Sequence, residues 1–368
     1  MITNFRKALS LTTALVMASS AVAYAEPSAE LIEAAKKEGM LTTIALPHDW
    51  CGYGAVIDGF KKKYPEITVN ELNPDAGSAD EVEAIKANKD NKGPQAPDVV
   101  DVGLAFGPQM KAEGLLQPYK VSTWDEIPEN VKDAEGYWYG DYYGVMSLLV
   151  NKDLVANTPK DWSDLLKPEY AGQVALAGDP RASNQAILGV LAAGLASGAK
   201  AGKDAGEAGL KYFGELNKAG NFVPVIGKSG TLAQGATPIV VMWDYNALAA
   251  KDTLAGNPPV EVVVPASGVL AGVYVQGISA FAPHPNAAKL WMEYLYSDEG
   301  QTAWLAGYCH PARFNAMSAA GKIPADLLAK LPPAESYAKA YFPTLEEVDA
   351  NKAAVTGAWD SVVGANVQ

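Results

Sequence analysis

The stretch LTTIAL at residues 41–46, taken with the segments that follow it up to residue 102, decides the fold. Its β-branched residues and the proline directly after it predict a short strand. Val56–Tyr64 carries apolar residues on one helical face, and Ile67–Leu72 and Asp98–Val102 predict two further strands. This order of strand, helix and strand is typical of an α/β protein with a parallel sheet between helices.

The same alternation continues on both sides of this stretch. Ala29–Glu38 is expected to be a helix with Ser28 as its N-cap. The 368 residues suggest two domains, and no Pro- or Ser-rich linker divides them, so we expect the chain to cross between two lobes more than once. Further strands are expected at Tyr143–Val150, Gln173–Ala177, Pro238–Trp243, Val260–Val264 and Val273–Ala282. Further helices are expected at Asp80–Lys89, Pro159–Leu166, Gln185–Ser197, Ala205–Gly220, Asn286–Tyr296 and Gly300–Leu305, followed by a helical tail from Pro324 that breaks at Pro332-Pro333.

Composition and charge exclude several classes of function. Apolar residues make up 49% of the chain and charged residues 19%, which is an ordinary globular mixture and not a disordered one. The formal net charge of −13 argues against a nucleic-acid-binding protein, because phosphate contacts need a basic face. The same charge argues against electrostatic binding to a membrane surface.

The first 25 residues have the pattern of a signal peptide. Arg6 and Lys7 give a positive start, the apolar stretch Ala8–Met17 follows, and the segment ends with the small residues Ala23 and Ala25 on either side of a tyrosine. We expect cleavage after Ala25 and export of the rest as a soluble protein. The alternative is an uncleaved membrane anchor. The apolar stretch is short for a membrane span, and no later stretch approaches 18 apolar residues.

The sequence offers little for catalysis or metal binding. It contains neither an HExxH pair nor a GxSxG elbow. His48, His284 and His310 stand apart from one another, and no cysteine pair has metal-ligand spacing. GKS at residues 227–229 resembles the end of a phosphate loop, but Phe222 stands where the first glycine is required. We therefore predict a surface turn there, and we predict neither an enzyme nor a bound metal or cofactor.

The two cysteines, Cys51 and Cys309, leave two structural possibilities open. In an oxidising compartment they could form a disulfide, or they could be two separate buried thiols. His310 follows Cys309, so a hydrolase with Cys309 or Cys51 as its nucleophile is a further possibility. The simpler interpretation of His310 is a loop histidine beside a bridged or buried cysteine.

Three loops follow predicted strands and precede predicted helices, at His48–Gly54, Gly103–Gly107 and Gly178–Gln185. Ligands of α/β sheets collect at the carboxyl ends of strands, and helix starts present free N–H groups. An aromatic residue in such a loop is a better candidate for a binding site than one inside a strand. The aromatic candidates are Trp50, Tyr53, Phe106, Trp243, Tyr245 and Tyr274.

Several short motifs, taken in their order, resemble those of bacterial extracellular solute-binding proteins. The resemblance covers nearly the whole chain after residue 25, and the order is more specific than any single motif. It includes the first lobe, a crossover, the entry to the second lobe, a ligand loop and a late pair of helices. The motifs are APDVV (96–100), GLLQPY (114–119), YGV (143–145) through NKDLV (151–155), PKDWSDLL (159–166), GQVAL (172–176), DPRASN (179–184), PNAAK (285–289) and SDEGQ (297–301).

This resemblance implies an α/β, two-lobed periplasmic-binding-protein fold. Each lobe would have a central mixed β-sheet flanked by helices, and hinge strands would join the lobes and absorb the closure rotation. The expected parts are lobe I at 26–145 and 272–312, lobe II at 146–271 and 313–368, and hinge strands at Tyr143–Val150 and Pro265–Tyr274.

The resemblance also implies a function. Such a protein closes on a small-molecule solute in the periplasm and delivers it to an inner-membrane ABC permease and its ATPase subunit, and we expect a monomer. The branch resembles the one that holds ferric-ion, polyamine, aminoethylphosphonate and sugar-phosphate binders. The resemblance places Cys51 and Cys309 in the first lobe, which favours a disulfide between them.

One departure from this branch bears on the ligand. Ferric members carry two consecutive tyrosines after the strand that matches Pro238–Met242, whereas this chain has Trp243, Asp244 and Tyr245. A single phenolate puts ferric binding in doubt. Tyr142-Tyr143 is a tyrosine pair, but it lies at the crossover, where we expect a structural role.

We therefore predict a ligand that bears an amine. Asp244 would pair with its ammonium group, between Trp243 and Tyr245 and with Trp50 and Tyr274 as further walls. The alternative role for Asp244 is to cap a helix that begins near Asn246. A polyamine, a γ-aminobutyrate-like amino acid or an aminophosphonate would fit, and a ferric-ion binder, a sugar-phosphate binder or a structural envelope protein are the alternatives. An anionic end of the ligand would lie near Arg181, Ser183 and Asn184.

Overall fold

The computed structural model describes residues 26–331 and 339–368. The chain begins with helix α1 (Ala29–Glu38), and the Ser28 side chain accepts a hydrogen bond of 3.2 Å from the N–H of Leu31. Gly39 ends the helix with a φ of 69°, which a glycine adopts without strain. The predicted helix and its cap are therefore confirmed. The predicted cleavage site after Ala25 and the predicted break at Pro332-Pro333 lie outside the described residues.

The predicted strand–helix–strand unit is present next along the chain. Strands β1 (Met40–Ile44) and β2 (Thr68–Leu72) pair in parallel, and α2 (Tyr53–Lys63) connects them. Helix α3 (Ser78–Ala87) then leads to β3 (Val99–Gly103). The prediction that β3 extends the same parallel sheet is wrong, because β3 pairs antiparallel with a strand some 170 residues later.

That second, larger sheet is mixed. Its main strand order is β3-β9-β5-β7-β6, and β4, β8 and β10 pair along the sides of these strands. β6 and β7 pair in parallel, and the other pairs are antiparallel. The strands are β4 (Leu116–Gln117), β5 (Trp138–Asn151), β6 (Val174–Leu176), β7 (Ile239–Trp243), β8 (Val260–Val263), β9 (Ala271–Ser279) and β10 (His310–Pro311).

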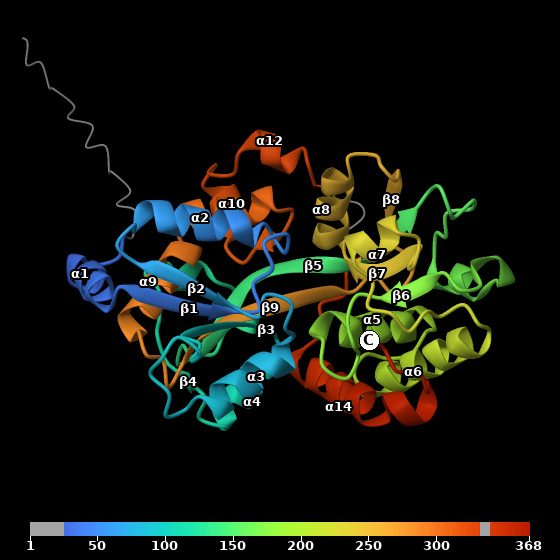
Figure 1. Ribbon diagram of the computed structural model, residues 1–368, viewed down its shortest axis with the longest axis horizontal. Helices are drawn as coiled ribbons and strands as arrows, with labels where there is room; N and C mark the ends of the chain where they lie inside the picture. Colours follow the sequence, from blue (N-terminus) through green and yellow to red (C-terminus); the bar gives the residue numbers. More distant parts are fainter. Residues whose placement is uncertain (1–25, 332–338) are drawn as a thin grey trace, which may run out of the picture.

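Strand β5 belongs to both ends of this sheet. Residues 138–145 of β5 pair with β9, and residues 146–151 pair with β7 and β8. Figure 1 shows β5 and β9 running through the middle of the molecule between two groups of elements. We call α1 to α4 with α9 to α12 the first lobe, and α5 to α8 with α14 the second lobe. The predicted hinge segments coincide with β5 and with the approach to β9, and their hinge motion stays a prediction.

The helices cover both lobes. The predicted helix at 159–166 is instead a short 3₁₀ helix, Trp162–Leu166, with Asp161 as its N-cap. Further 3₁₀ turns lie at Trp124–Glu126, Glu129–Val131 and Pro168–Tyr170. The remaining helices are α4 (Phe106–Ala112), α5 (Asn184–Ala196), α6 (Lys203–Lys218), α7 (Ser229–Ala233), α8 (Asp244–Leu254), α9 (Pro285–Leu295), α10 (Asp298–Ala306), α11 (Phe314–Ala319), α12 (Ala325–Leu328) and α14 (Leu345–Val362).

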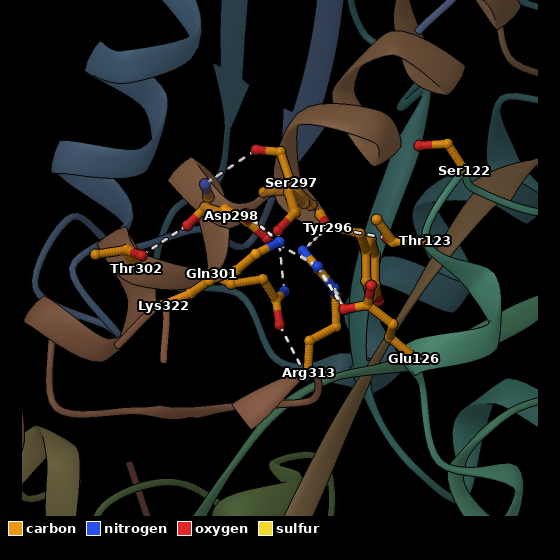
Figure 2. Close-up of polar contacts among 12 residues, drawn as sticks. Ser122, Thr123, Glu126, Tyr296, Ser297, Asp298, Gln301, Thr302, Arg313 and Lys322 are labelled. Atoms are coloured by element: carbon orange, nitrogen blue, oxygen red, sulfur yellow. Dashed lines mark hydrogen bonds and ion pairs between the residues drawn. The ribbon is translucent and has the colours of Figure 1, made fainter. Parts of the chain in front are cut away.

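A buried arginine ties the segment after β10 to the first lobe. Arg313 is 1% exposed and donates to Glu126 Oε2 at 2.5 Å and to Asp298 Oδ1 at 2.8 Å, as Figure 2 shows. Lys322 reaches the other oxygen of Asp298 at 2.8 Å. The predicted boundary assigns Arg313 to the second lobe, whereas these contacts join it to the first, and α14 packs against α5 and α6. The lobe boundaries therefore stay a prediction.

Cys51 and Cys309 form a disulfide, with their Cα atoms 5.3 Å apart. This confirms the predicted bridge. It joins the loop before α2 to the segment between α10 and β10, and both cysteines are fully buried. Within residues 26–331 and 339–368, no helix is both long enough and apolar enough to span a membrane.

Candidate binding cleft

A cleft of about 540 Å³ lies between the two lobes. Two of the three predicted loops line it, through Asp49 and Trp50 after β1 and through Gly178, Asp179 and Ala182–Gln185 around the start of α5. The third loop, Gly103–Gly107, does not line it. Two segments that we did not predict also line it, at residues 75–81 before and in α3 and at 226–234 around α7, together with Met242, Asn246 and Ala250 of β7 and α8.

Four of the predicted ligand residues line this cleft, namely Trp50, Ser183, Asn184 and Tyr274. The rings of Trp50 and Tyr274 meet edge to face with their centroids 5.3 Å apart. Ser183 is the N-cap of α5, and Asn184 is its first residue. The two lobes therefore bring two aromatic rings and the start of a 13-residue helix to one cavity.

Asp244 and its aromatic neighbours lie outside the lining. Oδ1 of Asp244 accepts a hydrogen bond of 2.9 Å from the N–H of Val145 in β5, and Asp244 is fully buried. The ring of Trp243 covers Gly272, and that of Tyr245 covers Gly144, where a Cβ atom would collide with each ring. These side chains pack on the strands that cross between the lobes. The ligand role of Asp244 stays a prediction, and the lining of the cleft gives it no support.

The alternative prediction, that Asp244 caps a helix beginning near Asn246, is wrong. Helix α8 begins at Asp244 itself, and its N-cap is Trp243. The side chain of Asp244 reaches across to the backbone of β5 instead.

Three more predicted residues also lie outside the lining. Tyr53 is fully buried beneath the cleft, and Phe106 is 3% exposed with Lys352 Nζ 3.4 Å from its ring centroid. Arg181 donates to Asp179 Oδ1 at 2.8 Å and to Asn366 near the C-terminus at 2.9 Å. Each of these side chains thus has a partner within the protein. Their contacts with a ligand stay predictions.

Two carboxylic acids of the lining, Asp101 and Glu81, were not predicted from the sequence. Asp101 lies in β3 and is 6% exposed, and its Oδ2 accepts hydrogen bonds from Tyr142 at 2.5 Å and Tyr53 at 2.9 Å. Glu81 of α3 is 1% exposed and accepts from the N–H of Asp101 at 2.9 Å. The available signal was a carboxylate inside the apolar strand DVVDV, since a charge is rarely buried there without a function or a partner.

A third buried carboxyl group, that of Asp141 in β5, belongs to the same hydrogen-bond network as Asp101. Asp141 accepts from Gln276 Nε2 at 2.8 Å and from the N–H of Tyr142 at 2.7 Å. Burial raises the pKa of Asp101 to about 6. Burial, followed by the charge of Asp101, holds the pKa of both Asp141 and Glu81 well above the usual carboxyl range.

The cleft is strongly acidic. Its lining includes one basic residue among the described residues, Lys228, which reaches Asp75 across the mouth at 3.0 Å. Asp179 is paired with Arg181, whereas neither Glu81 nor Asp101 forms an ion pair within the described chain. The acidic lining residues are Asp49, Asp75, Asp80, Glu81, Asp101 and Asp179.

The two lobes touch at several points around the cleft. Tyr308 after α10 donates to Asp252 of α8, and Lys352 of α14 donates to Gln109 of α4 at 2.6 Å. Gly103 at the end of β3 faces Asn184, whose side chain occupies the space that a Cβ atom would need. The lobes are thus held in contact beside the cavity.

The hydrolase alternative is wrong, because both cysteines are consumed in the disulfide and neither offers a thiolate. Within the described residues, no group of three or more His, Cys, Asp or Glu side chains is arranged to hold a metal ion.

Comparison with known proteins finds a matching family and several relatives by sequence. Residues 95–351 match the family described as bacterial extracellular solute-binding protein. An uncharacterised protein of Haemophilus influenzae is 30% identical over 67% of this chain and 70% of its own length. A putative 2-aminoethylphosphonate-binding periplasmic protein of Salmonella typhimurium is 27% identical over 56% of this chain and 59% of its own.

Solved structures share the fold. The periplasmic binding protein AfuA from Actinobacillus pleuropneumoniae, solved with fructose 6-phosphate, is 22% identical and has a TM-score of 0.68 over 88% of this chain and 98% of its own. The chain therefore belongs to the bacterial extracellular solute-binding proteins, which bind small-molecule solutes for ABC importers and are not enzymes.

Proposed function

We propose that this protein captures a small solute that bears an ammonium group and delivers it, as a periplasmic monomer, to an inner-membrane ABC permease and its ATPase. The observation that carries the proposal is a pair of cleft carboxyl groups, Asp101 and Glu81, that form no ion pair with any described residue and lie beside the rings of Trp50 and Tyr274. The carboxylate that we assign to the ligand is thus Asp101 and not Asp244.

Electrostatics supports a cationic group at this place. A carboxylate shielded from water attracts a nearby cation far more strongly than one in bulk solvent. Aromatic faces add about 0.5–2 kcal/mol for a desolvated cation. An anionic solute at the same place would meet the negative charge of Asp101, and that repulsion disfavours a sugar phosphate there.

The start of α5 supports a second, electron-rich group on the solute. Nδ2 of Asn184 is buried beside the Tyr274 phenol and makes no well-aligned hydrogen bond within the described residues. The N–H groups at the start of a helix favour anionic groups. A solute with an amine at one end and a carboxylate or phosphonate at the other would satisfy both ends of the cleft. The relative named as a putative 2-aminoethylphosphonate-binding protein is consistent with that chemistry.

A direct experiment is native mass spectrometry of the ligand that co-purifies, followed by thermal-shift measurements with chosen solutes. We would test 2-aminoethylphosphonate, γ-aminobutyrate and putrescine against fructose 6-phosphate and ferric ion. A solute present at 100 times its dissociation constant should stabilise the fold by about 2.7 kcal/mol. Tight binding of fructose 6-phosphate or ferric ion, with no stabilisation by any amine, would overturn the proposal.

The variant Asp101→Asn tests the assigned residue. It keeps the shape of the side chain and removes the charge, so it should weaken amine binding by about 2–5 kcal/mol and leave the unliganded protein folded. Asp125→Asn, on an exposed 3₁₀ turn outside the cleft, is the matched control and should bind normally. Equal affinity of the Asp101→Asn variant and its parent would exclude Asp101 as the partner of the ammonium.

A further inference from the structure

Asp101 and Asp141 form a pair of carboxyl groups beneath the cleft. One hydrogen-bond network joins the two side chains. Nε2 of Gln276 donates to Asp141 Oδ2 and to the Tyr53 hydroxyl, each at 2.8 Å, and Tyr53 donates to Asp101 Oδ2 at 2.9 Å. Two buried carboxyl groups in one network cannot both be ionised at ordinary pH without a cation, so one of them retains a proton. Oδ1 of Asp101 has no N–H or O–H donor among the described residues. Oδ1 of Asp101 is therefore the oxygen that can carry the proton.

Among the described residues, no cation is paired with either group in a way that would allow both to ionise. Neither Asp101 nor Asp141 forms an ion pair within the described residues, and both are nine-tenths or more buried. The pair receives neutral donors instead, from tyrosine hydroxyls and from the Gln276 amide. The titratable groups that face it are Tyr53 of α2, Glu81 of α3, Tyr142 of β5, Tyr245 of α8, Tyr274 of β9 and Tyr296 after α9.

We propose that Asp101 and Asp141 share one proton in the unliganded protein, and that capture of the ammonium group drives this proton into solvent. Before binding, the pair carries one negative charge. After binding, two carboxylates face one ammonium, so the net charge of the site is unchanged. This inference rests on the proposed capture of an amine. It makes Asp141, which does not line the cleft, a residue that sets the affinity for cations.

The physical reason is the cost of two like charges in a dry environment. Two carboxylates that share a buried site cannot both ionise at ordinary pH unless a cation is added. Burial raises the pKa of Asp101 to about 6, and that of Asp141 lies well above the usual range. Below the higher pKa of the pair, the ligand must displace a proton. The dissociation constant should therefore rise up to tenfold for each unit by which the pH falls in that range.

The test is isothermal titration calorimetry at pH 6.5 in buffers with different enthalpies of ionisation. The probe is whichever of putrescine, γ-aminobutyrate and 2-aminoethylphosphonate binds most tightly. We expect close to one proton released per ligand by the parent and by the control Asp125→Asn. Asp141→Asn removes the second carboxyl group but keeps an amide of the same shape, so it should still bind the amine and release almost no proton. Its affinity at pH 5.5 should exceed that of the parent several-fold.

A second measurement does not depend on the ligand. Carboxyl ¹³C NMR of the unliganded protein should show Asp101 titrating at a lower pH in Asp141→Asn than in the parent, because the partner charge is absent. If the amine binds tightly without proton release, the shared proton is excluded and the proposed function stands. If no amine binds, the proposed function fails. The NMR titration alone then decides whether Asp101 and Asp141 share a proton. Identical titration of Asp101 in the two proteins would overturn the inference.

Discussion

The Nε1 atom of Trp50 donates a hydrogen bond of 2.7 Å to the hydroxyl of Tyr142. Trp50 lines the cleft, whereas Tyr142 is buried in β5, the strand that runs between the lobes. The same hydroxyl donates to Asp101 at 2.5 Å. Tyr142 therefore orients both an aromatic wall of the cleft and the carboxyl group beside it, which is more than the structural role that we expected from its place at the crossover.

We expect Tyr142→Phe to weaken ligand binding as well as the fold. The substitution removes one hydroxyl, which leaves Nε1 of Trp50 without its acceptor and leaves Asp101 with Tyr53 as its remaining hydroxyl donor. Loss of these hydrogen bonds should lower the free energy of unfolding by about 1–3 kcal/mol. The affinity for an amine should fall further than stability alone explains, and urea denaturation with calorimetry would measure the two effects.

The matched control is Tyr143→Phe at the next position of the same strand. The ring of Tyr143 stacks on His310 with a centroid distance of 4.9 Å, away from the Trp50–Asp101 contacts. Its affinity should equal that of the parent. Equal losses of affinity in both variants would show that Tyr142 acts only through the general stability of β5.

Removal of the disulfide should destabilise the protein without abolishing the chemistry of the cleft. The free energy of unfolding of the double variant Cys51→Ser, Cys309→Ser should be about 2–5 kcal/mol lower than that of the parent. Denaturation with and without a reductant would measure this, since the reductant should affect the parent and leave the double variant unchanged. Two reactive thiols in the denatured, unreduced parent would contradict the bridge.

Local structure could be predicted from the sequence where its cause is local. Helix α1 has its N-cap at Ser28 and its terminating glycine at Gly39, so both ends are set by neighbouring residues. The partner of β3 could not be predicted in this way. β3 pairs with β9, far along the chain, and the apolar pattern of a strand does not state which strand lies beside it.

The same limit explains why the sequence points to Asp244 and not to Asp101. Both are carboxylates beside or inside an apolar strand, and only the position of neighbouring strands decides which one reaches the cleft. Asp244 meets the backbone of β5 at Val145. Asp101 shares a face of β3 with Gly103, and Gly103 lies against Asn184 of the opposite lobe. The aromatic residue Trp50 could be predicted, because a loop after a strand is exposed to ligands in most α/β folds.

Stability should rise with pH between about 4 and 6.5 through His310. Burial lowers the pKa of His310 to about 4, below its value of 6.5 in the unfolded chain. Between these values the unfolded state binds the proton more readily, so falling pH favours unfolding. The slope should reach about 1.4 kcal/mol per pH unit at most. His310→Gln should make the slope of the unfolding free energy against pH less positive than in the parent by up to that amount, measured by urea denaturation from pH 4 to 7. An unchanged slope would contradict the assignment.

The contact between Tyr308 and Asp252 should slow the release of the ligand. Tyr308 follows α10 of the first lobe and donates to Asp252 in α8 of the second, so opening the cleft breaks this hydrogen bond. Because Asp252 is exposed to solvent, the contact is worth only ~0.2–1 kcal/mol. Tyr308→Phe and Asp252→Asn should therefore each accelerate dissociation by up to about fivefold, as measured by stopped-flow tryptophan fluorescence.

The double variant distinguishes a direct contact from two unrelated effects. If the hydroxyl and the carboxylate act through each other, the double variant should dissociate no faster than either single variant, since the interaction is already lost. The matched control is Tyr341→Phe, whose hydroxyl donates to Glu347 at 2.7 Å only six residues along the chain and spans no cleft. That variant should release the ligand at the parental rate. Multiplicative acceleration in the Tyr308/Asp252 double variant would show that the two residues do not hold the lobes together.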